Sequence, residues 1–225
     1  DTVPDINIAE NIADGSLIAT LGVQDPDAGD SFTYSLVDDA GGAFAIDADT
    51  GAITIADGSV IDYETTTSMD IIVRVTDGGG LSHDEVVTIN VTDVNEAPTI
   101  TSNGGGDTAS ISVNEKTTGV TTVAASDVDA GTTLTYSIVG GADAGKFTIN
   151  SSTGELSFAS GPNYEAPTDV GGDNTYQVIV QSSDGTLTDT QTLNVTVGNV
   201  NEAPTNITLS NNSIAENSAA GTVVG

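Results

Sequence analysis

Asp93-Val94-Asn95-Glu96-Ala97-Pro98 returns almost unchanged as Asn199-Val200-Asn201-Glu202-Ala203-Pro204. Both copies are short and polar, so neither can be a core element, and both end in proline. Proline has no backbone N–H and a fixed φ angle, which suit the exit from a strand and a stiff connector. The stretch therefore predicts a linker between two copies of the same fold.

Working outward from the two linkers, the rest of the chain aligns with itself. The matched segments are Ile6–Asn11 with Ile111–Glu115, Val23–Gly29 with Ala125–Gly131, Phe32–Leu36 with Leu134–Ile138, Phe44–Ile53 with Phe147–Leu156, and Ile61–Glu64 with Pro162–Glu165. Each copy closes with two long apolar runs separated by an Asp-Gly turn. The alignment predicts repeats at residues 1–97 and 98–203 and the truncated start of a third at 204–225.

The runs are rich in Val, Ile and Thr, alternate with the period of a half-buried strand, and show no helical periodicity. About seven short strands fall in each copy, with turn residues between them. In the segments Asp47–Gly51 and Asn150–Gly154 the glycine is expected to supply a positive φ in a hairpin turn. The sequence therefore predicts an all-β protein made of two antiparallel β-sandwiches in tandem.

The net charge of the chain excludes several classes of binding partner. The 225 residues include 33 acidic and 3 basic side chains, a formal charge of −30. Such a chain repels nucleic acid and cannot form a polybasic patch for an anionic membrane, whereas it attracts cations. Adaptation to salt, or solubility alone, would also raise the acidic content. Without cysteine, disulfide, redox and thiolate-metal roles are excluded.

No apolar run is long enough to span a membrane, and no signal peptide is present. Residues 213–225 begin the repeat motif and stop within it. We therefore expect the sequence to be a segment of a longer chain.

Acidic residues recur at fixed places that end-to-end sandwiches would bring to the Asp93 linker. Eight carboxylates are expected to converge there: Glu10, Asp62, Glu64, Asp93, Glu96, Asp127, Asp129 and Asp184. So many negative charges repel one another unless their pKa values rise or cations lie among them. Hard oxygen ligands without His or Cys favour Ca²⁺ over zinc or iron. The alternative is that the acids are separate, solvated turn residues.

Taken in order, these motifs resemble cadherin repeats of the type found in tandem in bacterial surface proteins. The resemblance is carried over nearly the whole chain by Ala-Glu-Asn, Asp-x-Asp, Tyr-Ser-Leu/Ile, Phe-x-Ile-Asp with Thr-Gly-x-Ile, Asp-Tyr-Glu, Asp-Gly-Gly and Asp-Val-Asn-Glu-Ala-Pro. It implies seven-stranded Greek-key sandwiches of immunoglobulin-like form that bind Ca²⁺ between successive repeats. The implied metal ligands are Glu10, Asp62, Glu64, Asp93, Val94, Asn95, Glu96, Asp127, Asp129 and Asp184, with the backbone near Val94, Ala97 and Gly131 adding carbonyl groups.

The second linker departs from this pattern, with Asn163 in place of Asp62 and Asn199 in place of Asp93. Only Glu115, Glu165 and Glu202 remain charged there. We therefore expect this second site to bind Ca²⁺ weakly or not at all. Asp25, Asp27 and Asp77 would need ligands from a preceding repeat, and poor occupancy is expected there too.

The function expected from this resemblance is that of a Ca²⁺-rigidified adhesion or scaffold module on the cell surface or in the secreted space. Its expected partners are neighbouring repeats of the same chain and a homophilic, cell-surface or carbohydrate partner, but neither nucleic acid nor a membrane. Two alternatives stay open: a carbohydrate- or protein-binding module that uses the sandwich loops, and a fibre that assembles by strand addition. Paired acids could suggest a glycosidase, but no pocket of aromatic residues accompanies them, so no enzyme activity is expected.

Overall fold

The computed structural model describes residues 3–27, 29–208 and 213–222. Contacts divide the chain into two compact units. The first unit holds the residues up to Pro98 together with Ser126–Thr133 and Asp184–Leu187, and the second holds Thr99–Ala125, Leu134–Ser183 and the residues from Thr188 onward. Ala28 of the Asp-x-Asp motif, and residues 209–212 and 223–225 of the expected third copy, lie outside the described residues, as do residues 1–2.

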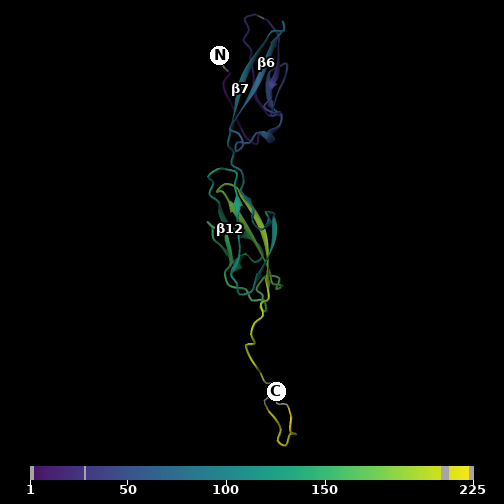
Figure 1. Ribbon diagram of the computed structural model, residues 1–225, viewed down its shortest axis with the longest axis vertical. Coiled ribbons are helices and arrows are strands. Elements are labelled where there is room, and N and C mark those ends of the chain that lie inside the picture. The colour runs from purple at the N-terminus through teal and green to yellow at the C-terminus, as the bar shows by residue number, and fades with distance from the viewer. Residues whose placement is uncertain (1–2, 28, 209–212, 223–225) are drawn as a thin grey trace. The chain divides into compact units, whose positions relative to one another are not determined.

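The first unit is built from two facing sheets, of strand order β1-β7-β6-β3 and β2-β5-β4. Its strands are β1 (Ile6–Ala9), β2 (Leu17–Thr20), β3 (Phe32–Asp38), β4 (Phe44–Ile46), β5 (Ala52–Ile55), β6 (Ser68–Asp77) and β7 (Ser82–Thr92), and its one described helical turn is η1 (Gly58–Val60). Figure 1 labels the long antiparallel pair, β6 and β7, in this unit.

The second unit repeats this plan with sheets of order β12-β15-β16-β9 and β10-β14-β13 and adds a short pair, β8 with β11. Its elements are β8 (Thr99–Ile100), η2 (Ser102–Gly104), β9 (Thr108–Asn114), β10 (Gly119–Thr122), β11 (Ala125–Ser126), β12 (Thr135–Gly140), η3 (Ala144–Lys146), β13 (Phe147–Ile149), β14 (Glu155–Phe158), β15 (Thr175–Ser183) and β16 (Thr188–Gly198). The expected sandwich class is confirmed, with strands throughout and only single turns of helix among the described residues.

The expectation of purely antiparallel sheets is wrong at one pair in each unit. β1 runs parallel to β7 through four residue pairs, from Ile6 with Ile89 to Ala9 with Thr92. β9 runs parallel to β16 through seven, from Thr108 with Thr192 to Asn114 with Gly198. A parallel pair needs a long crossover connection, and here the remaining strands of the unit provide it. The C-terminal ends of both strands of each pair therefore lie at the same end of the sheet.

Alternation of buried and exposed residues builds the core of each unit. In β15 every second residue is buried, so Tyr176, Val178 and Val180 point inward while their neighbours lie nearer to solvent. The cores contain mainly β-branched and leucine side chains, which pack well on a pleated surface. In the second unit Phe147 stacks on Phe158 at 4.5 Å between ring centroids. This packing fixes the strand ends from which the acidic residues project.

The predicted hairpin turns are present in both units. Asp47 Oδ1 accepts hydrogen bonds from the N–H groups of Asp49 and Thr50 at 3.1 and 2.8 Å. Asn150 Oδ1 accepts the equivalent pair at 2.9 and 3.1 Å. Gly51 and Gly154 close the turns with φ angles of 68° and 71°, which confirms the expected role of glycine.

Candidate metal centre

Glu10 anchors the candidate site at the end of β1. Its side chain is buried, with the residue only 4% exposed. Oε2 accepts the N–H of Tyr63 at 2.9 Å, and Oε1 accepts the N–H of Val94 at 2.8 Å. One carboxylate thus ties the Asp62-Tyr63-Glu64 turn and the linker after β7 to the end of β1. It places three separated stretches of chain within reach of one another.

Of the seven other predicted carboxylates, six lie on the Asp62–Glu64 turn, the linker and the loop of Asp127 and Asp129. Asp184 lies on a separate turn, and all of them belong to the first unit. Ligand oxygens of Glu10, Asp62 and Glu64 lie within 4.8 Å of one another, as do those of Glu64, Asp93 and Asp129. Glu64 belongs to both groups and joins them. We call Glu10, Asp62, Glu64, Asp93, Glu96, Asp127 and Asp129 the first acidic cluster.

Two loops contribute to the first unit from beyond the linker. Asp129 Oδ2 accepts the N–H of Glu96 at 3.0 Å, and Asp127 Oδ1 accepts the N–H of Asp129 at 3.0 Å. Asp184 accepts a hydrogen bond from the amide of Asn95 at 2.7 Å. The segments Ser126–Thr133 and Asp184–Leu187 therefore meet the linker through acidic side chains.

Three carboxylate oxygens of the cluster lack any donor. Glu96 Oε2, Asp127 Oδ2 and Asp129 Oδ1 are buried from solvent and have no hydrogen-bond partner. Leaving a charged oxygen in this condition is costly, and buried polar atoms in proteins are almost always satisfied. A cation in contact with these oxygens would remove the cost. The candidate metal-ligand atoms are all oxygens, which fits a hard ion such as Ca²⁺.

Three carboxyl groups of the cluster have raised pKa values. Burial, followed by the charges of Glu10 and Glu96, raises the pKa of Glu64. Burial and the charges of Asp129 and Glu10 raise the pKa of Asp93, and burial with the charges of Glu10 and Asp129 raises that of Glu96. These carboxyl groups hold their protons more tightly than usual because burial and neighbouring negative charges disfavour their ionised form.

Basic side chains do not relieve the first cluster. The chain has three, Arg74, Lys116 and Lys146. Arg74 pairs with Asp84 in the first unit, and Lys116 pairs with Glu202 in the second. In the described part of the chain, no ion pair joins a basic residue to the first cluster.

Two of the predicted ligands make hydrogen bonds within the site. Val94 takes part through its N–H, which Glu10 accepts. The carboxylate of Asp184 is already bonded by the N–H groups of Thr186 and Leu187 and by Asn95, and these bonds, led by that of Thr186, lower its pKa. Asp127 and Asp129, in contrast, each have one buried carboxylate oxygen without a hydrogen-bond partner.

Asn11 belongs to the site and was missed by reasoning from sequence. Its side-chain amide donates to Glu96 Oε1 at 2.5 Å. Its φ of 56° lies in the left-handed region, which asparagine tolerates better than most residues. The sequence signal for Asn11 is the repetition of Ala9-Glu10-Asn11 as Ala215-Glu216-Asn217. Asn217 has a similar φ of 60°.

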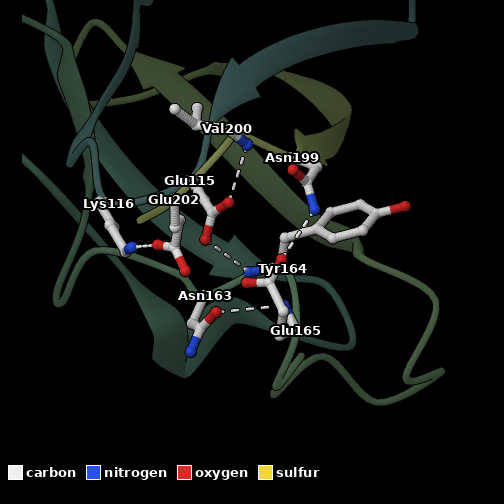
Figure 2. A network of polar contacts seen from close by, with 8 residues as sticks. All are labelled: Glu115, Lys116, Asn163, Tyr164, Glu165, Asn199, Val200 and Glu202. Atoms are coloured by element: carbon white, nitrogen blue, oxygen red, sulfur yellow. Dashed lines mark hydrogen bonds and ion pairs between the residues drawn. The ribbon is translucent and has the colours of Figure 1, made fainter. Parts of the chain in front are cut away.

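The second unit holds a smaller group at the equivalent position, made of Glu115, Glu165 and Glu202 with oxygens within 4.8 Å. We call these three residues the second acidic cluster. Figure 2 shows Glu115 between the N–H groups of Tyr164 and Val200, with Lys116 pointing to Glu202. The ring of Tyr164 points away from the carboxylates, so it provides no cation–π face for the cluster.

His83 and two tyrosines also make polar contacts within their own units. His83 is exposed on β7 and lies 3.3 Å from Glu85. The hydroxyl groups of Tyr136 and Tyr176 accept the N–H groups of Ala125 and Thr168 at 3.3 and 3.1 Å. Among the described acids, a further group of Asp25, Asp27 and Asp30 lies exposed in the first unit.

Comparison with known proteins identifies the family. The cadherin domain model matches residues 4–92 and 107–198. The chain therefore belongs to the cadherin-domain family. It is 30% identical to human protocadherin Fat 1 over 207 residues, which are 88% of this chain and 4% of that protein. It is 33% identical over 172 residues to cadherin-related family member 1 of Xenopus laevis, covering 70% of this chain and 20% of that protein.

Solved cadherin structures share the architecture. Mouse cadherin-23 EC22-24 aligns with a TM-score of 0.59 at 27% identity and covers 88% of this chain and 63% of that chain. Human protocadherin-24 EC1-2 aligns with a TM-score of 0.65 at 22% identity, covering 88% of this chain and 95% of that one, and supports the fold alone. The described residues contain no helix with the length and apolar character needed to cross a bilayer.

Proposed function

We propose that this chain is a Ca²⁺-binding adhesion or scaffold segment of a larger extracellular protein, and that the first acidic cluster is its metal site. The observation that carries the proposal is the group of buried carboxylate oxygens on Glu96, Asp127 and Asp129 that have no donor. The absence of a basic partner in the described residues and the raised pKa values of Glu64, Asp93 and Glu96 support it.

The proposed ligands are Glu10, Asp62, Glu64, Asp93, Glu96, Asp127, Asp129 and Asp184, with the side chain of Asn95 and the backbone of Val94. When bound, Ca²⁺ would supply positive charge and accept oxygen ligands without a fixed geometry. The chain's own part is to hold the acids together against repulsion. Glu10 does so through the N–H groups of Tyr63 and Val94, and Asp129 through that of Glu96.

Bound Ca²⁺ would cross-link the Asp62–Glu64 turn, the linker and the loop of Asp127 and Asp129. Their separation in sequence makes the cross-link depend on the fold, so the unfolded chain has no such site. Binding therefore stabilises the folded state by mass action and limits the freedom of the chain around the linker.

The adhesive and extracellular part of the proposal rests on the family. The relatives carry the names of cadherins and protocadherins, and one aligned structure is titled as extracellular cadherin domains of protocadherin gamma B2. The chain spans about 4% of the human Fat protocadherins, so partners and surface location are proposed here for the segment alone. A bacterial surface origin and a non-enzymatic role, with neighbouring repeats as partners, belong to the same proposal.

The test compares Glu64→Ala and Asp127→Ala with Asp49→Ala, which removes an exposed acid of the β4–β5 turn. Calorimetric titration with Ca²⁺, melting curves and small-angle scattering are recorded for each variant with Ca²⁺ and with EDTA. We expect Ca²⁺ to raise the melting temperature and stiffen the wild-type chain and the control, and to have little effect on the cluster variants. Identical scattering and melting of the wild type in Ca²⁺ and EDTA would exclude the proposal.

A second candidate is self-assembly by strand addition. A pocket of about 630 Å³ in the first unit is lined by residues that include Val23, Tyr34 and His83. In the second unit the equivalent of His83, Asp189, instead accepts the N–H of Ile100 in β8 at 2.7 Å. Pro204-Thr205 repeats the Pro98-Thr99 that leads into β8, and the nearby Ile207 is 94% exposed.

Residues 204–208 of one molecule would then occupy the pocket of another, in the manner of β8. Analytical ultracentrifugation tests this by comparing the full chain with a variant lacking the last twenty-two residues. Concentration-dependent oligomers lost on deletion support strand addition, and a monomer at all concentrations refutes it. Binding to a glycan array, unchanged by the deletion, would instead identify the carbohydrate-binding alternative.

A further inference from the structure

The two acidic clusters share one backbone frame. Glu115 Oε2 accepts the N–H of Tyr164 at 3.1 Å and Oε1 that of Val200 at 2.8 Å, as Glu10 does with Tyr63 and Val94. The N–H of Glu165 bonds to Asn163 Oδ1 at 3.1 Å, as that of Glu64 bonds to Asp62. The frame therefore presents equivalent side-chain positions in both units, and differences between the clusters lie in the side chains.

Three side chains of the second frame carry less negative or more positive charge. Asn163 replaces Asp62, Asn199 replaces Asp93, and Lys116 replaces Asn11. The first frame carries five acids at these positions: Glu10, Asp62, Glu64, Asp93 and Glu96. The second frame carries three acids and one ammonium group. The formal charge changes from −5 to −2.

Each replacement makes a contact within the second cluster. The amide of Asn199 donates to Glu165 Oε1 at 2.7 Å. The ammonium group of Lys116 pairs with Glu202 Oε1. Figure 2 shows Lys116 and Asn199 approaching the three glutamates from opposite sides. Glu165 and Glu202 thereby gain a donor from the chain, and Glu115 keeps its two backbone N–H donors. In the first cluster, Glu96 accepts the amide of Asn11 on Oε1, but its buried Oε2 has no partner.

The backbone of Lys116 directs its side chain to this place. Its φ is 63°, close to the 56° of Asn11, and its N–H donates to the carbonyl oxygen of Pro162 at 2.8 Å. The left-handed region is uncommon for lysine and easier for asparagine. The backbone conformation alone would therefore favour asparagine over Lys116 at this position. The pKa of Glu115 is lowered, first by its bond from Val200 and also by the nearby Lys116 charge.

We propose that Lys116 is a built-in counter-ion that takes, in the second acidic cluster, the place of the divalent cation in the first. The second cluster then keeps its arrangement without metal. This inference rests on the proposed function only in its comparison with the first cluster. Because Lys116 and Glu202 are 60% and 38% exposed, their attraction is screened by salt, so concentrated NaCl loosens the second cluster.

The test uses hydrogen exchange with mass spectrometry on the full chain, in millimolar Ca²⁺ and in EDTA. It follows segments 62–66 and 93–97 for the first cluster and 163–166 and 199–203 for the second. The variant is Lys116→Asn, since Asn11 shows that asparagine suits this backbone. Lys146→Asn, at an exposed lysine on η3, is the matched control, and Lys116→Arg keeps the charge.

In EDTA, the second-cluster segments of the wild type should remain as protected as in Ca²⁺. Lys116→Asn should exchange there about two- to fivefold faster, as expected for loss of an exposed ion pair, and Ca²⁺ should restore protection. Lys146→Asn and Lys116→Arg should resemble the wild type.

Wild-type exchange in Lys116→Asn under EDTA would overturn the proposal, as would equal protection by Ca²⁺ at both wild-type clusters. Failure of the proposed function gives a different result, in which Ca²⁺ leaves the first-cluster segments of the wild type unprotected. The comparison of Lys116→Asn with wild type in EDTA then still decides the role of Lys116.

Discussion

Glu10 and Glu115 occupy the same position in the two units, and each buried carboxylate binds two backbone N–H groups. The partners are Tyr63 and Val94 in the first unit, and Tyr164 and Val200 in the second. These bonds join the end of β1 or β9 to a late turn and to the linker that follows the last strand of the unit. The glutamate is therefore part of the fold as well as of the proposed metal site.

Replacing Glu10 should destabilise the first unit even without metal. Glu10→Ala leaves two N–H groups without their acceptor, and losing hydrogen bonds of this kind should lower the melting temperature by about 5–10 °C. Glu10→Gln keeps one acceptor oxygen and should lie between the alanine variant and the wild type. Scanning calorimetry in EDTA measures this separately from Ca²⁺ binding. If Glu10→Ala melts like the wild type in EDTA, the residue has no structural role.

Gly154 should tolerate no side chain. A Cβ atom there would lie 2.0 Å from the carbonyl oxygen of Val123, and the φ of 71° is unfavourable for other residues. We expect Gly154→Ala to destabilise the second unit by about 3 kcal/mol or more. Gly145→Ala is the control, because a Cβ at that position meets no atom within 4 Å. Urea unfolding curves that place both variants together would contradict the expectation.

Acid should weaken the β4–β5 turn of the first unit more than its counterpart in the second. The hydroxyl of Thr50, then the N–H groups of Thr50 and Asp49, lower the pKa of Asp47 in the folded state. A carboxyl with a depressed folded pKa stabilises the fold above its unfolded value of about 3.9. That contribution is lost as the pH falls through the lower folded value.

Asn150 holds the equivalent turn without a titrating group. Asp47→Asn should therefore remove part of the acid sensitivity, and Asn150→Asp should add a similar amount to the second unit. Denaturant unfolding at pH 7 and pH 3 measures the difference between each variant and the wild type. Equal pH dependence in all three chains would show that the Asp47 bonds contribute nothing.

Much of the fold could be predicted because its signals are local. The period-two alternation in Tyr176–Val180 predicts a strand buried on one face, and Asp47–Gly51 predicts a hairpin turn. The parallel pairing of β1 with β7 could not be predicted in this way. It joins residues more than eighty positions apart, and nothing in Ile6–Ala9 specifies the direction of its partner. The two-residue strands β8 and β11 are too short for any periodicity.

The site was partly predictable for the same reason. Repetition of the linker and of Asp-Tyr-Glu pointed to Glu64 and Asp93, which lie with Asp129 in one group. The part of Asn11 was not predicted, because an amide that donates to Glu96 looks like any polar residue in a turn. The contact of Lys116 with the second cluster was likewise not predicted. Its contact with Glu202 spans 86 positions and exists only in the folded unit.

The parallel pairs β1–β7 and β9–β16 also determine how the units respond to mechanical tension. Pulling the two ends of a unit apart would slide β1 against β7, or β9 against β16, because the two strands of each pair run in the same direction. The rungs of the ladder then share the load in shear and must break together. With seven residue pairs against four, the second unit should yield at the higher force.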